Sequence, residues 1–156
     1  NMAPRQHMRK MKVGKVTFTE AYKAVNEYRQ KFPQKAVTFY AQNYPAMGWA
    51  VFMAGGSCPV IPCTDKAFLK DAAAMEVEET NTDEYKKMVK SDIGSIIYSK
   101  SGTEIPVQLS SGKYVLKYIH PASGKIETIN KSLKINGLYN LKVPDKKEGI
   151  YWFHKL

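Results

Sequence analysis

The chain lacks the features that define membrane proteins and disulfide-rich domains. It has 156 residues, only two cysteines and no long apolar run. A membrane-spanning helix needs about 20 predominantly apolar residues, whereas the longest clean run here is Trp49 to Ala54. The basic start of the chain is not followed by an apolar segment, so it is not an intact signal peptide. These absences exclude a membrane span and indicate that any export signal would lie upstream.

Metal ligands are equally scarce. Cys58 and Cys63 are separated by four residues, and His7, His120 and His154 are far from them in sequence. Because a zinc site needs four ligands of suitable type brought together, this spacing predicts no metal, and no motif predicts a cofactor. The two cysteines form either a local disulfide or a pair of free thiols, and the sequence leaves both alternatives open.

Arginine is absent from residues 94–156, although this segment contains ten lysines and the whole chain has a net charge of +10. Arginine is the usual residue for bidentate contacts with phosphate and guanine. We therefore expect no nucleic-acid partner. The lysines indicate a solvated surface, with an anionic polymer as the alternative partner.

No charged residue occurs from Ala36 to Cys63. This stretch is too interrupted to cross a membrane, so it is either the buried part of a fold or the wall of a binding site. An α/β layer explains it without any function, because strands covered by helices on both faces are almost continuously apolar.

The pattern of the first 75 residues is of this α/β kind. Residues 17–32 predict an amphipathic helix with a Thr17–Glu20 capping box, stopped by Pro33. Residues 35–42 predict a strand. The run 48–56, GWAVFMAGG, is either a helix or a buried strand.

A second helix is predicted over residues 63–77, with Thr64 as its N-cap. Its inward positions would be apolar and spaced for one face of a helix: Ala67, Phe68, Ala72 and Met75. Residues 76–92 are rich in acidic residues and have the composition of a linker.

The pattern changes after residue 92. Seven short alternating runs, separated by SG, SSG, ASG, NG and DKKEG, predict a small antiparallel β-sandwich over residues 93–156. No helix is expected between Ile96 and Pro144. The expected inward side chains are Ile97, Val107, Val115, Tyr118, Leu141 and Trp152.

Two stretches resemble a known family. GWAVFMAGGSCPVIP (48–62) and GSIIYSKSGTEIPVQLSSGKYVLKYIHPASGKIE (94–127) are similar to the C-terminal end of bacterial (β/α)8-barrel glycoside hydrolases that carry a C-terminal β-sandwich, of a type labelled collagen-binding. The Pro121–Gly124 turn and the closing GIYWFHKL fit the same pattern. The resemblance implies an α+β chain in which residues 1–75 are the end of a barrel-like α/β domain and 48–56 its last strand.

Such hydrolases act through two carboxylates, yet no Asp or Glu lies between residues 28 and 64. We therefore assign no catalytic residue. Substrate contact could remain, because sugars stack on aromatic rings and bind amide side chains. The candidates are Tyr40, Gln42, Asn43, Tyr44 and Trp49, with a structural role for Tyr40, Asn43 and Trp49 as the alternative.

The sequence thus predicts a fragment of a secreted or periplasmic carbohydrate-active hydrolase, itself non-catalytic, whose sandwich stabilises the protein or binds a glycan. Its partners would be a polysaccharide and the missing N-terminal part of the same protein. The alternative is a stand-alone binding module for an anionic polysaccharide or a protein. A cysteine-dependent enzyme using Cys58 or Cys63 ranks lowest.

Overall fold

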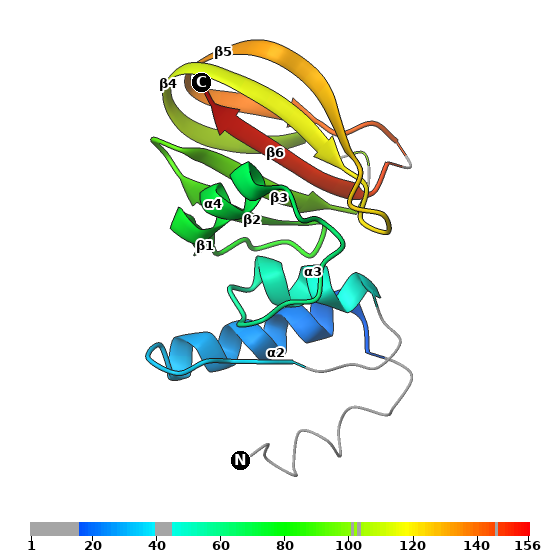
Figure 1. The fold of residues 1–156 in the computed structure, drawn as a ribbon. Helices are drawn as coiled ribbons and strands as arrows, with labels where there is room; N and C mark the ends of the chain where they lie inside the picture. The colour runs from blue at the N-terminus through cyan, green and yellow to red at the C-terminus, as the bar shows by residue number, and fades with distance from the viewer. Residues whose placement is uncertain (1–15, 40–44, 101, 103, 146) are drawn as a thin grey trace. The chain divides into compact units, whose positions relative to one another are not determined.

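The computed structural model describes residues 16–39, 45–100, 102, 104–145 and 147–156. The chain forms two compact units, Asn1–Pro59 and Val60–Leu156. The first contains helices, and the second contains one helix and a six-stranded antiparallel sheet (Figure 1). The α+β class predicted from the sequence is confirmed.

Helix α2 (Phe18–Lys31) forms the long element of the first unit. Its capping box is confirmed, since the Thr17 side chain accepts a hydrogen bond from the Glu20 backbone and the Glu20 carboxylate accepts one from the Thr17 backbone N–H at 2.8 Å. The helix ends before Pro33, as predicted. One face buries apolar side chains: Phe18, Ala21, Tyr22 and Val25.

The charge-free run forms helix α3 (Pro45–Met53), so its assignment as a last barrel strand is wrong. Trp49, Ala50 and Met53 are all fully buried, and a short helix that is apolar all round satisfies its backbone internally while its side chains are covered. The missing charges therefore reflect burial of a helix.

Residues 36–39 form no regular secondary structure, so the strand predicted over 35–42 is not formed in its described part. Residues 40–42 of that prediction lie outside the described residues. The Val37 backbone instead pairs with Ser57, whose N–H donates to the Val37 carbonyl at 2.6 Å. An isolated extended segment can satisfy its polar groups through such a contact without a sheet.

The second unit is built on one antiparallel sheet with the strand order β1-β2-β3-β6-β4-β5. The strands are β1 (Glu76–Glu78), β2 (Tyr85–Lys90), β3 (Gly94–Ser99), β4 (Glu104–Ile119), β5 (Ile126–Lys142) and β6 (Gly149–Lys155). The described residues between 96 and 144 contain no helix, as predicted.

Residues 76–92 were expected to be an acidic linker, and this expectation is wrong for their secondary structure. They contain β1 and β2, which pair with each other and, through β2, with β3. The acidic composition reflects a sheet edge: β1 is short and exposes Glu76 and Glu78, a common way to keep an edge strand from pairing with another chain.

Two segments predicted to be turns instead lie inside long strands, where together they form a bend. SSG (110–112) and NG (136–137) lie opposite each other in the β4–β5 hairpin, where the pairing passes from Leu109↔Gly137 to Gly112↔Ile135 with a shift of register. Such an irregularity bends a strand pair, and Figure 1 shows β4 and β5 as strongly curved ribbons. The seven predicted runs therefore form four strands.

The bend brings the two halves of the hairpin around one apolar cluster. Ile97, Val107, Tyr118 and Leu141 lie in this cluster, as predicted. Trp152 and Val115 belong to the opposite face. Trp152 is fully buried there, whereas Val115 is half-buried. Alternation along β4 and β6 places these two residues on that side.

Helix α4 (Lys66–Ala74) covers this second face of the sheet. Its N-cap is Asp65, one residue beyond the predicted Thr64, and the Asp65 carboxylate accepts from the Phe68 N–H at 2.8 Å. Phe68, Ala72 and Met75 are buried as predicted, but Ala67 is exposed. The Phe68 ring meets the Trp152 indole edge-on at 5.4 Å.

Both cysteines are free thiols: Cys58 is exposed and Cys63 is buried. Burial raises the pKa of the Cys63 thiol. Helices in the described part of the chain are all too short or too polar to cross a membrane.

Candidate binding hollow

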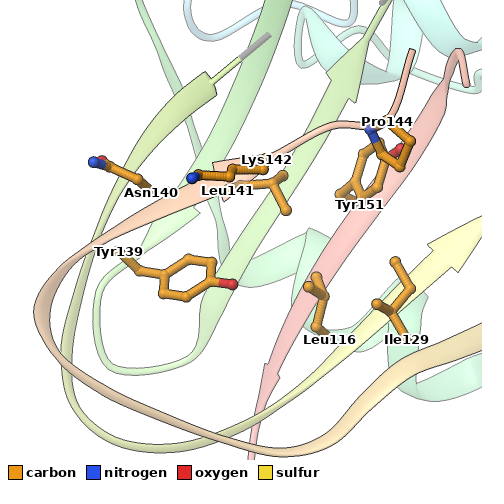
Figure 2. Close-up of a pocket in the computed structure, with 8 residues that line it drawn as sticks. All are labelled: Leu116, Ile129, Tyr139, Asn140, Leu141, Lys142, Pro144 and Tyr151. Atoms are coloured by element: carbon orange, nitrogen blue, oxygen red, sulfur yellow. The ribbon is translucent and has the colours of Figure 1, made fainter. Parts of the chain in front are cut away.

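A hollow of about 310 Å³ opens beside the bent hairpin in the second unit (Figure 2). Three strands and the segment after β5 contribute to its lining, which consists of Leu116, Ile129, Tyr139, Asn140, Leu141, Lys142, Pro144 and Tyr151. We refer to this set as the hollow. Its volume lies at the lower end of the range found for small-molecule sites.

The corner of the hairpin creates the hollow. Ile129 lies before the bend in β5, and Tyr139 and Leu141 lie after it. Folding the strand back brings these side chains toward Leu116 on β4 and Tyr151 on β6. β5 supplies five of the eight lining residues and is an edge strand of the sheet.

Tyr139 is the half-buried aromatic ring of the hollow. Figure 2 shows it directed inward from β5, whereas the neighbouring Asn140 is directed away. Its ring meets the Phe153 ring at 5.7 Å, so one side is fixed by the core. A ring held in this way offers its remaining surface to an apolar face of a ligand.

One lining residue of the hollow is a buried tyrosine, Tyr151. The Tyr151 hydroxyl donates to the Lys147 carbonyl at 3.3 Å, so it is already engaged. Burial, followed by the nearby Tyr118, raises the pKa of Tyr151 to about 12. Tyr151 is therefore neutral at physiological pH and contributes a ring rather than a charge.

A group of polar side chains continues the same face of the sheet beyond Leu116. Tyr118 is directly opposite Glu127 in the β4–β5 pairing. The Glu127 carboxylate is 2.9 Å from His120 Nε2, and the His120 ring meets the Tyr118 ring at 4.7 Å. The Lys147 ammonium lies over the Tyr118 ring at 4.3 Å. We call Tyr118, His120, Glu127 and Lys147 the polar end.

The polar end carries an ionised carboxylate. The hydrogen bond with His120, followed by the charges of His120, Lys125 and Lys147, lowers the pKa of Glu127. Burial raises the pKa of Tyr118, and the charges of Glu127 and Glu148 raise it further. At neutral pH the polar end therefore combines a carboxylate acceptor, an ammonium donor and a neutral phenol.

A second polar cluster serves to attach α4. The buried Asp71 carboxylate accepts hydrogen bonds from Trp152 Nε1 at 2.9 Å and faces His154 Nδ1 at 2.7 Å. The Lys117 ammonium lies over the Trp152 ring at 4.2 Å. Because Asp71 is on α4 and its two partners, Trp152 and His154, are on β6, these contacts hold the helix on the sheet.

Of the five residues predicted to contact substrate, Trp49 is the one that the structure describes. Tyr40, Gln42, Asn43 and Tyr44 lie outside the described residues. Trp49 is 0% exposed on α3 and meets the Phe52 ring edge-on at 5.5 Å, which is the geometry of a core aromatic. Its contact with a glycan stays a prediction.

Sequence reasoning missed Tyr139 and Tyr151 as hollow residues and missed Glu127 and His120 as a pair. Tyr139 lies in GLYNLKVP (137–144) and Tyr151 in GIYWFHKL (149–156), which were interpreted only as strands. The alternation shows that these residues point to one face. It does not show where the hairpin bends, and the bend decides that they meet.

Comparison with known proteins gives limited matches. A family model described as "Domain of unknown function (DUF6298)" matches residues 1–75, just under half of the chain. No curated protein matches the sequence. A solved structure named "Glycoside hydrolase" is similar at 15% identity with a TM-score of 0.39. The match covers 51% of this chain and 19% of that one, so the chain spans a small part of that protein.

Proposed function

We propose that the chain is the C-terminal part of a secreted or periplasmic carbohydrate-active hydrolase and that its sheet-containing unit is a glycan-binding accessory module. The proposal extends the sequence resemblance to barrel hydrolases with a C-terminal sandwich. Its catalytic part would be the upstream portion of the same protein, and the first unit, which ends at Pro59, would be the end of that domain.

The observation that carries the binding role is the hollow. It combines an inward-facing, half-buried tyrosine ring with aliphatic walls and a neighbouring polar group. Sugars present apolar C–H faces beside a fringe of hydroxyls, so they fit a ring next to hydrogen-bonding groups. A site of this kind suits binding of a glycan and not its hydrolysis.

The absence of carboxylates from the lining supports a non-catalytic role. No Asp or Glu is among the eight lining residues of the hollow. Several acids in the described segments have structural partners: Glu20 and Asp65 cap helices, and Asp71 binds Trp152. A glycosidase needs two carboxylates facing each other across the scissile bond. We expect the purified chain to leave aryl glycosides unhydrolysed.

Binding is tested by affinity electrophoresis of the full chain in gels containing xylan, galactomannan, β-glucan or polygalacturonate, followed by calorimetry with matching oligosaccharides. Tyr139→Ala should weaken binding by about 1–3 kcal/mol, the scale of one aromatic contact. Leu138→Ala is the matched control, because Leu138 is adjacent on β5 and 61% exposed. Equal binding by both variants, with both still folded, would exclude the hollow as the glycan site.

A further inference from the structure

The polar end lies on the same face of the sheet as the hollow and extends it. Tyr118 follows Leu116 at an alternate position of β4, and Glu127 precedes Ile129 on β5. His120 lies just after the end of β4, with its ring 4.7 Å from that of Tyr118. Tyr118 also meets Tyr151 at 5.3 Å between ring centroids. A ligand that covers the Tyr139 ring and reaches along this face therefore meets the polar end next.

The polar end has unused hydrogen-bonding capacity. His120 Nε2 and Lys125 Nζ both approach the same oxygen of Glu127, Oε1, at 2.9 and 3.8 Å. Within the described residues, neither Glu127 Oε2 nor His120 Nδ1 has a hydrogen-bond partner. The side chains of Glu127 and His120 are 42% and 38% exposed, so both groups can reach a ligand.

The side chains of the polar end suit the hydroxyl groups of a ligand better than its charged groups. A hydroxyl both donates and accepts, so two adjacent hydroxyls can donate to a carboxylate and accept from an ammonium at the same time. One oxygen of Glu127 already has a cation beside it, since Lys125 Nζ lies 3.8 Å from Oε1, and Oε2 is the oxygen left to meet a ligand. A carboxylate on the ligand would add a like charge beside Glu127, and like charges in contact are unfavourable.

We propose that the polar end recognises two adjacent free hydroxyls of a neutral sugar residue, with Glu127 as the acceptor. This inference rests on the proposed glycan-binding function and narrows its ligand from glycans in general to uncharged sugars with a vicinal diol. It argues against the anionic polysaccharide that the lysine content alone would suggest.

The test uses full-length protein and ligands that differ in one chemical feature. Each neutral polysaccharide of the panel is compared with the same material after periodate oxidation and borohydride reduction, which cleaves vicinal diols without adding charge. Polygalacturonate is compared with its carboxyl-reduced form, which has the same sugar backbone without the charge. The variants are Glu127→Gln, His120→Gln and, as a control, Glu104→Gln, an exposed acid on β4 outside the hollow.

We expect periodate treatment to abolish binding and Glu127→Gln to weaken it about tenfold, the scale of one hydrogen bond to a charged group. His120→Gln should act in the same direction, and Glu104→Gln should bind as wild type. The carboxyl-reduced galactan should bind at least about tenfold more tightly than polygalacturonate.

Tighter binding of the acidic form, or wild-type binding by Glu127→Gln, would overturn the inference. In that case, a loss caused by Tyr139→Ala would still leave the glycan-binding function standing. If no glycan of either charge binds, the function and the inference fall together. Binding of poly-glutamate as tight as that of the polysaccharides would show that the chain attracts any polyanion. This result would also contradict the inference.

Discussion

The indole of Trp152 on β6 donates a hydrogen bond of 2.9 Å to the carboxylate of Asp71 on α4, 81 positions earlier in the chain. The same carboxylate oxygen faces His154, two residues further along β6. Neighbours at positions i and i+2 of a strand point to the same face, so one buried acid joins the helix to the sheet at two points.

Asp71→Ala should destabilise the second unit by about 3 kcal/mol, because it removes the partner of two side chains and leaves the buried Trp152 N–H unsatisfied. Urea unfolding followed by tryptophan fluorescence, in the Trp49→Phe background so that Trp152 is the reporter, measures this change. Asp92→Ala, at an exposed acid in the turn before β3, is the control and should change stability little. Equal stability of the two variants would mean that the cluster does not hold α4.

Trp49→Ala should lower stability by about 3–5 kcal/mol, the cost of removing a large buried aromatic side chain. Circular dichroism during thermal unfolding measures the loss, and Phe32→Ala, at a residue 39% exposed in the same unit, is the control. Because Trp49 is also a predicted glycan contact, binding is measured below the melting temperature. Unchanged melting with lost binding would favour the contact over the core role.

The Glu127–His120 pair should make stability fall in acid. The hydrogen bond with His120 lowers the folded-state pKa of Glu127 below the ordinary value of 4.5, so the stabilisation is present above the unfolded pKa and is lost as pH falls through the folded pKa. The difference in melting temperature between wild type and Glu127→Gln should be full above the ordinary pKa of 4.5 and should shrink as the pH falls below that value. A difference that stays constant over this range would contradict a stabilising pair.

Gly94→Ala should be strongly destabilising. Gly94 has φ +154°, and a Cβ atom there would overlap the Phe153 carbonyl on the paired strand β6, where backbone cannot move aside cheaply. We expect a loss of about 3 kcal/mol in urea unfolding. Gly112→Ala is the matched control, since its Cβ would meet the flexible end of Lys155 at 3.1 Å and the Tyr114 ring at an ordinary contact distance of 3.6 Å. Similar losses at both positions would show that the contact with Phe153 is not the cause.

The sequence by itself determined the elements whose signals are local. The Thr17–Glu20 capping box and Pro33 set the ends of α2, and the turn at Pro121–Gly124 set the β4–β5 connection. Period-two alternation placed Ile97, Val107, Tyr118 and Leu141 in the core. These signals depend on contacts within a few residues or on one repeating face, so they can be recognised without knowing the partners.

Tertiary structure decided the rest. A charge-free run suits a buried helix as well as a buried strand, and the packing of Trp49 within its unit made it α3. Acidic residues 76–92 became strands because β3 offered an edge to pair with. SSG and NG became a corner because they lie opposite each other. That corner bends β5, and Tyr139 and Tyr151 line the same hollow although they come from parts of the chain that no local pattern connects.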